Sequence, residues 1–200
     1  MSKLAAPLFV CASMVMLSAC QQPPAPPAPA KTEEPKPSPA ERGKYLVTAM
    51  GCNDCHTPWK MGPNGPEPDM TRFLSGHPED AKLGPVPKPQ GGWLFAGSAD
   101  FTAWAGPWGI SYTANLTPDQ NTGLGIWTEQ IFVDAIRLGK HMGKTRPILP
   151  PMPWPAFKNL SDDDLKAIFA YLRTIPAITN HVPDPVIAPP PPAATGGKKK

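Results

Sequence analysis

The sequence has few cysteines, no long apolar run and little net charge. Only four of its 200 residues are cysteine, and only Cys52 and Cys55 stand close together. A structural zinc site typically takes four ligands from two such pairs, so a two-knuckle zinc fold is excluded. The longest apolar run, residues 4–17, is too short for a dedicated transmembrane helix.

The net charge indicates which partners to exclude. The formal charge is +3 at pH 7, and the last three residues of the chain are all lysines. Without them the remainder of the chain is about neutral. Nucleic-acid-binding domains carry a concentrated basic surface, so the sequence does not predict a nucleic-acid partner.

Proline is abundant instead, with 31 residues that cluster at the two ends of the chain and around positions 85–89 and 147–155. Residues 21–39 read QQPPAPPAPAKTEEPKPSP. Because proline fixes φ and lacks an N–H donor, this stretch predicts a semi-extended spacer rather than a helix or a sheet. Residues 183–200 have a similar composition and end in lysines, so we predict a disordered tail there. The folded domain is expected over residues 40–182.

The N-terminal 19 residues have the form of a signal peptide, with one lysine before a short apolar run. The run ends in Leu17-Ser18-Ala19-Cys20, which resembles a bacterial lipobox. That resemblance implies a lipid on the thiol of Cys20, with residues 20–39 as a tether to the membrane. The alternative is an ordinary cleaved signal. We expect an exported, lipid-anchored protein on the periplasmic side, and Gln21 after the cysteine favours the outer membrane.

The stretch GCNDCH, residues 51–56, carries the main chemical signal. Export removes Cys11 with the signal and leaves Cys52 and Cys55 for a disulfide, a metal or a cofactor. A dithiol redox pair would need a βαβ context, which the neighbouring sequence lacks. Two thiols at this spacing add to the vinyl groups of a haem, and the adjacent His56 then becomes the proximal iron ligand. We therefore predict one covalent haem c.

A sixth iron ligand must be sought elsewhere. Met152 lies within ILPPMPWP, residues 148–155, where prolines hold the chain extended and stiff. Such a loop presents a thioether at a fixed place, so Met152 is the predicted distal ligand, with Met142 and His141 as alternatives. The other candidates are less distinctive in context: Met61, Met70, His77 and His181.

Helix signals appear at three places, and they predict an all-α fold. Ser38, Pro39 and Glu41 form a capping box with proline in the first turn. Thr128 and Ser161 cap two further amphipathic segments. The first covers about residues 129–138, and the second follows Ser161 and is terminated by Pro176. Residues 57–110 are rich in Pro, Gly and Trp and predict long packed loops with short strands. The expected fold has about three to five helices around one haem.

These motifs together resemble a class I c-type cytochrome. The stretch YTANLTPD at 112–119, with TGLG at 122–125 and Trp127, is more specific. It is similar to cytochrome domains associated with bacterial membrane-bound alcohol and aldehyde dehydrogenases. The resemblance covers about residues 41–176 and implies that the two end helices cross closely, with Gly43 and Tyr171 as a contact pair. It also brings Asn115 near the haem edge, where it donates to a propionate or simply forms a turn. Such subunits often carry several haems, whereas this chain has one site.

Three functions compete at this stage. The first is a lipid-anchored electron carrier between a dehydrogenase or quinol-oxidising complex and a downstream cytochrome or oxidase. The second is a haem enzyme or gas sensor with an open or displaceable sixth position. The third is a lipoprotein whose Cys52 and Cys55 form a local disulfide, which leaves His56 and the Met152 loop unexplained. We favour the electron carrier, in which no residue is catalytic.

Overall fold

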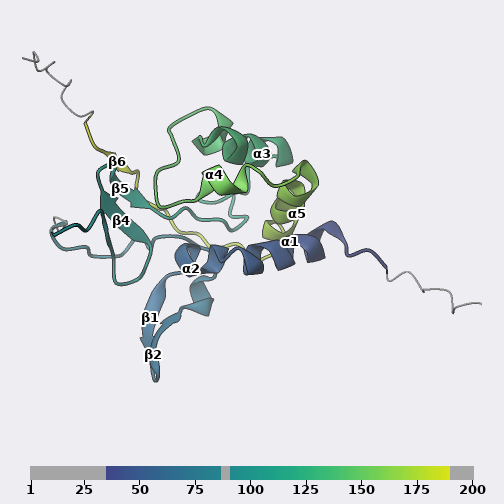
Figure 1. Cartoon of the computed structure of the whole chain (residues 1–200). Coiled ribbons are helices and arrows are strands. Elements are labelled where there is room, and N and C mark those ends of the chain that lie inside the picture. Colours follow the sequence, from purple (N-terminus) through teal and green to yellow (C-terminus); the bar gives the residue numbers. More distant parts are fainter. Residues whose placement is uncertain (1–34, 87–90, 190–200) are drawn as a thin grey trace, which may run out of the picture. The chain divides into compact units, whose positions relative to one another are not determined.

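A computed structural model describes residues 35–86 and 91–189 (Figure 1). The predicted signal peptide, Cys20, most of the tether and the terminal lysines lie outside these residues. None of the helices in the described part is long and apolar enough to cross a membrane. The helices are α1 (Pro39–Ala49), α2 (Cys52–His56), α3 (Glu129–Leu138), α4 (Trp154–Phe157) and α5 (Asp162–Leu172), with single 3-10 turns at Met70–Arg72 and His141–Gly143.

The helix ends follow the predicted caps. Ser38 and Glu41 make both hydrogen bonds of a capping box at the start of α1. The side chains of Thr128 and Ser161 accept from backbone N–H groups at the starts of α3 and α5. Gly139, with a φ of 62°, ends α3 in the left-handed conformation that glycine adopts without strain.

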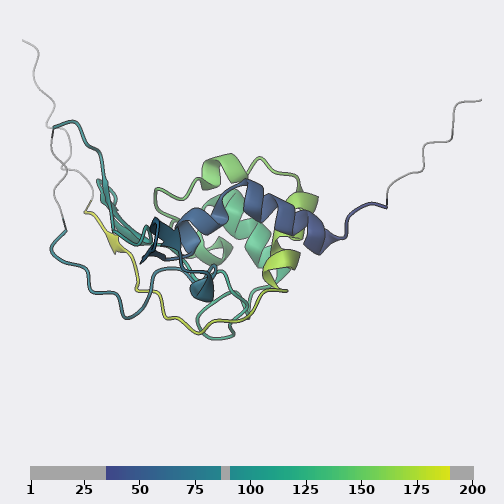
Figure 2. The same ribbon diagram turned by 90° about the horizontal axis from the view of Figure 1, so that it is seen from below.

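The core lies where α1 crosses α5, and the two helices meet side by side in both views (Figures 1 and 2). A Cβ placed on Gly43 would lie 1.9 Å from the carbonyl oxygen of Ala167 and 2.8 Å from Cβ of Tyr171. The close crossing implied by the resemblance is therefore present. Around it the buried apolar side chains form one cluster: Leu46, Val47, Leu74, Leu124, Phe132, Val133, Ile136, Leu165, Ile168, Phe169 and Leu172.

The long loop region carries the short strands. Strands β1 (Trp59–Gly62) and β2 (Gly65–Pro68) form a hairpin. A second antiparallel sheet has the order β3-β4-β5-β6, from β3 (Ala96–Gly97), β4 (Ala103–Gly106), β5 (Gly109–Tyr112) and β6 (Val186–Ile187). The small helical fold expected from the sequence is confirmed, with a modest amount of sheet beside it.

Strand β6 corrects the predicted end of the domain. We expected a disordered tail from residue 183, yet β6 pairs with β5 in the register Gly109↔Ile187 and Ile110↔Val186. The backbone N–H of Ala188 also donates to the carbonyl oxygen of Trp108 at 2.9 Å. The prolines around β6 do not prevent pairing, because an edge strand needs donors on one side only. The folded part therefore extends beyond residue 182.

Candidate functional site

Helix α2 presents the CxxCH residues directly after α1. Gly51 joins the two helices with a φ of 66°, a backbone conformation that L side chains rarely adopt. Cys52 and Cys55 are free thiols of intermediate exposure, and Cys52 packs against the core cluster. His56, at the end of α2, is 8 % exposed. One short turn of helix thus carries both thiols and the imidazole, with Cys52 against the apolar core.

The ring of His56 is held in one tautomer. Its Nδ1 atom lies 2.8 Å from the carbonyl oxygen of Ala114. A carbonyl cannot donate, so Nδ1 carries the hydrogen and Nε2 keeps its lone pair. Burial lowers the pKa of His56 below its usual value, which favours the neutral ring. A neutral imidazole fixed through Nδ1 is the usual state of a histidine that binds a metal through Nε2.

The Ala114 acceptor is positioned by the loop around Gly76. The backbone N–H of Gly76 donates to the carbonyl oxygen of His56 at 2.8 Å, and that of His77 donates to Thr113 at 2.9 Å. With a φ of 79°, Gly76 would place a Cβ 2.5 Å from the Thr113 oxygen and 2.7 Å from the Ala114 oxygen. Only glycine permits this approach, because any side chain would push the Ala114 carbonyl away from His56.

The thiols do not have the electrostatics of a reactive dithiol. Burial raises the pKa of Cys52 to about 11, and burial followed by the charge of Asp54 raises the pKa of Cys55. Redox dithiols need the opposite shift, because the thiolate is the attacking species. The raised pKa values of Cys52 and Cys55 therefore argue against the redox-pair interpretation.

The loop that carries Met152 is tied to the sheet. The hydroxyl of Ser111 on β5 donates to the carbonyl oxygen of Pro150 at 2.6 Å. On the other side of the methionine, the ring of Trp154 fills the space that a Cβ on Gly139 would need. Met152 itself is half-buried and packs against the core cluster. The predicted distal ligand therefore lies in a fixed loop beside the core.

The other candidate ligands lie in different surroundings. The ring of His141 packs edge-on against the ring of Trp127, with 5.4 Å between the ring centroids. Its Nδ1 atom lies 3.3 Å from the Thr145 hydroxyl. Met142, with a φ of 53°, is half-buried on the same turn but is not among the residues packed against the core. The remaining candidates are exposed or bonded elsewhere: Met61 and Met70 are 76 % and 61 % exposed, His181 is exposed, and Nδ1 of buried His77 lies 2.7 Å from the Thr102 hydroxyl.

Asn115 takes the turn-forming role of the two that the sequence left open. Its Oδ1 accepts from the backbone N–H of Thr117 at 3.0 Å and from the Thr117 hydroxyl at 2.7 Å. Its Nδ2 donates to the carbonyl oxygen of Ile178 at 2.8 Å and to the hydroxyl of Thr122 at 3.2 Å. The amide group is committed to protein partners in this structure.

Sequence reasoning missed Ala114, Gly76 and Asn180 as parts of the site. Ala114 acts through its backbone carbonyl, which leaves no mark on the side-chain pattern. Gly76 lies in Leu74-Ser75-Gly76-His77, where one glycine among many gives no distinct signal. Asn180, which is 6 % exposed, lies outside every motif and reaches the site only through tertiary contacts.

The residues present fit a covalently bound haem c. They are two thiols at the required spacing, an imidazole with Nε2 available and a half-buried thioether. Of these, Cys52 and Met152 both pack against the apolar core cluster. In residues 35–86 and 91–189 there is no group of three or more His, Cys, Asp or Glu side chains that would hold a bare metal ion.

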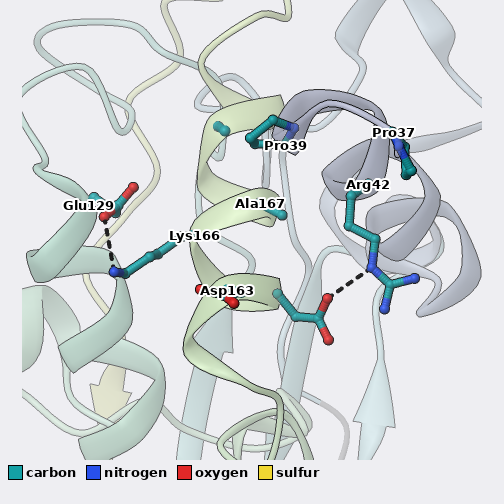
Figure 3. A pocket seen from close by; sticks show the side chains of 9 residues that line it. Pro37, Pro39, Arg42, Glu129, Asp163, Lys166 and Ala167 are labelled. Atoms are coloured by element: carbon teal, nitrogen blue, oxygen red, sulfur yellow. Dashed lines mark hydrogen bonds and ion pairs between the residues drawn. The ribbon is translucent and has the colours of Figure 1, made fainter. Parts of the chain in front are cut away.

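A groove lies elsewhere, between the start of α1 and α5 (Figure 3). Ala167 lines it, and ion pairs border it: Arg42 with Asp164 at 2.8 Å and Lys166 with Glu129 at 3.7 Å. Exposed ion pairs of this kind stabilise a fold only slightly. The groove contains none of the thiols, the imidazole or the thioether described above.

Comparison with known proteins identifies the family. Residues 40–176 match the family described as cytochrome c. The chain is 30 % identical over 148 residues to the cytochrome c subunit of the quinone alcohol dehydrogenase of Gluconobacter oxydans, covering 72 % of this chain and 23 % of the relative. It is 30 % identical over 151 residues to the fructose dehydrogenase cytochrome subunit of Gluconobacter japonicus. The aligned residues are 76 % of this chain and 24 % of that relative.

A third relative is the gluconate 2-dehydrogenase cytochrome c subunit of Pantoea cypripedii, 31 % identical over 132 residues, which are 66 % of this chain and 22 % of the relative. The chain thus spans about a quarter of the length of these relatives. The resemblance inferred from the CxxCH and NLTPD motifs is confirmed, and the chain belongs to the cytochrome c family.

Proposed function

We propose that this protein is a one-electron carrier with a single haem c, attached through Cys52 and Cys55 and ligated by His56 and Met152. When bound, the haem supplies the electron-transfer chemistry by alternating between its ferrous and ferric states. The observation that carries the proposal is the hydrogen bond from His56 Nδ1 to the Ala114 oxygen. It prepares the ring as an iron ligand through Nε2.

Each residue of the site has a separate task. The two thiols fix the cofactor covalently, so it is retained through every redox cycle. Ala114 holds the ring of His56 in place, and Ser111 holds the loop of Met152 through Pro150. Because both supports are hydrogen bonds that end on backbone carbonyl oxygens, they restrain both ligands when the charge of the centre changes. An electron carrier needs its site to rearrange little when an electron arrives or leaves.

A haem enzyme or gas sensor remains the second candidate. It would require the sixth position to be open or easily vacated. The hydrogen bond between Ser111 and Pro150 opposes this, because it restrains the loop that carries the thioether. A soft thioether ligand also stabilises ferrous iron and is typical of electron-transfer cytochromes.

The names of the relatives suggest the electron donor. Each is described as a cytochrome subunit of an alcohol, fructose or gluconate dehydrogenase. We propose that this chain accepts electrons from a dehydrogenase of that kind, or from a quinol-oxidising complex, and delivers them to a downstream cytochrome or oxidase. Co-purification of the native protein with a dehydrogenase subunit supports the first donor, and its absence from every redox complex contradicts both.

A lipid on Cys20 would hold the carrier at the membrane on the periplasmic side. Cys20 lies outside the described residues, so this proposal rests on the lipobox sequence. Replacing Cys20 by Ser should release the protein from the membrane fraction while its haem spectrum stays unchanged. A variant that remains in the membrane fraction would contradict the lipid anchor.

Covalent haem is the test of the proposed function. The exported protein should keep its haem through denaturing electrophoresis and acid-acetone extraction, and its absorption spectrum should be that of a low-spin haem. The double variant Cys52→Ala with Cys55→Ala should lose the covalent haem. A wild-type protein that releases its haem on extraction, or binds none, would overturn the proposal.

A further inference from the structure

A segment beyond the family match braces the site. The match ends at residue 176, and residues 177–182, here called the C-terminal strap, lead from α5 towards β6 (Figures 1 and 2, yellow). The strap forms no helix or strand, yet it contains Asn180, which is 6 % exposed. A buried asparagine in an irregular segment needs hydrogen-bond partners.

The side chain of Asn180 binds one loop of the site at three points. Its Nδ2 donates to the carbonyl oxygens of Ser75 and His77, at 2.8 and 2.9 Å. Its Oδ1 accepts from the backbone N–H of Glu79 at 2.9 Å. These contacts surround Gly76, whose N–H donates to the carbonyl oxygen of His56. Asn180 therefore fixes the loop that approaches the proximal histidine.

The strap also holds the segment that supplies the acceptor of His56. Asn115, the residue after Ala114, donates to the carbonyl oxygen of Ile178 at 2.8 Å. The backbone N–H of Asn180 donates to Thr122 at 3.0 Å, and the same Thr122 hydroxyl accepts from Asn115 at 3.2 Å. The strap thus holds both segments that bind His56: the Gly76 loop, which donates to its backbone carbonyl, and the Ala114 segment, which accepts from its ring.

We propose that Asn180 is a positioning residue that sets the strength of the hydrogen bond between His56 and Ala114, and through it the reduction potential of the haem. This inference rests on the proposed function. A strong bond to a carbonyl makes the imidazole more basic, which favours ferric iron. The two segments also bond directly, through the N–H of His77 and the carbonyl oxygen of Thr113. Without Asn180 the Gly76 loop loses its side-chain support, its alignment with the Ala114 segment loosens, and the hydrogen bond weakens. The potential then rises.

The test is Asn180→Ala in the haem-loaded full chain. The midpoint potential is measured by spectroelectrochemical titration, and exchange of the His56 Nδ1 proton is followed by NMR in the ferrous state. At the wild-type midpoint, the ratio of reduced to oxidised protein should rise several-fold in the variant. The Nδ1 proton should exchange faster. A role confined to stability would move the denaturation midpoint and leave both readouts unchanged.

Two further variants keep the test decisive. Thr179→Val removes the neighbouring strap hydrogen bond, from the Thr179 hydroxyl to Asp119 at 2.8 Å, and should leave the potential unchanged. Thr122→Val removes the acceptor of the Asn180 N–H and should shift the potential in the same direction by less. If Asn180→Ala does not fold, Thr122→Val tests the inference instead: a raised potential supports it and an unchanged potential contradicts it.

Three results overturn the inference. If folded Asn180→Ala keeps the wild-type potential and the wild-type rate of Nδ1 proton exchange, the inference is wrong and the proposed function still holds. If Thr179→Val shifts the reduction potential as much as Asn180→Ala does, the inference is also wrong, because the effect then belongs to the whole strap and not to Asn180. A wild-type protein without covalent haem overturns the proposed function as well.

Discussion

His56 and Ala114 lie 58 residues apart in the sequence, and the imidazole Nδ1 of the first donates to the carbonyl oxygen of the second at 2.8 Å. This bond joins the CxxCH helix to the YTANLTPD segment at 112–119, the two most distinctive parts of the sequence. One supplies the histidine, and the other supplies the acceptor that orients its ring.

Gly76→Ala should weaken that bond. The added Cβ would lie 2.5 to 2.7 Å from Thr113 and Ala114 backbone atoms, so the Ala114 carbonyl must move. We expect a higher reduction potential and a loss of stability of about 1–3 kcal/mol from overpacking and the positive φ. Spectroelectrochemical titration and chemical denaturation measure the two effects.

Gly92→Ala is the matched control for this variant. Gly92 has a similar φ, 90° against 79°, but nothing lies within 4 Å of its Cβ position. It should lose stability through backbone strain alone and keep the wild-type potential. Equal potentials in wild type and both variants would show that the Gly76 approach does not control His56.

Gly43→Ala should separate the two crossing helices. Its Cβ would lie 1.9 Å from the backbone oxygen of Ala167, and backbone cannot rotate aside as a flexible side chain can. We expect a loss of about 3 kcal/mol or more in the free energy of unfolding, measured by denaturant titration. Gly84→Ala, with open space around its Cβ, should change stability little. Similar values for both variants would contradict the close crossing.

Asp119 should make the fold sensitive to acid. Hydrogen bonds from Thr122, then from Thr179, lower the pKa of the Asp119 carboxyl from 3.8 to about 2. A folded-state pKa below the unfolded value gives stability that is present above about pH 4 and lost as the pH falls towards 2. Asp119→Asn should therefore be less stable than wild type at neutral pH, and the difference should shrink over that range. A difference that does not vary with pH would contradict this.

The helix ends could be predicted because their signals are local. Ser38, Thr128 and Ser161 each act on backbone groups within one turn, and all three cap as expected. The CxxCH motif is equally local, since five consecutive residues carry both thiols and the histidine.

The rest of the site depends on contacts between distant segments. Ala114 contributes a backbone oxygen, which any residue possesses. Asn180 contacts Ser75 and His77 more than 100 residues away, and β6 pairs although prolines flank it. Strands of two to four residues are too short to show an alternation of apolar and polar side chains, so the sequence pattern does not predict where the sheet lies.

The sixth ligand distinguishes a carrier from an enzyme, and the measurement is the spectrum of Met152→Ala with and without carbon monoxide. The variant removes the thioether and keeps the proline frame and the Ser111 contact to Pro150. We expect the methionine-to-iron charge-transfer band to disappear and the potential to fall, because the soft ligand stabilises ferrous iron. The ferrous variant should bind carbon monoxide readily, whereas wild type should bind it slowly or not at all.

Met142→Ala serves as the control for ordinary loss of packing, and it should keep the charge-transfer band and the resistance to carbon monoxide. The account predicts this contrast between the two methionines. A wild-type protein that binds carbon monoxide freely, with a spectrum that Met152→Ala leaves unchanged, would contradict it and favour a haem enzyme or sensor with an open sixth position.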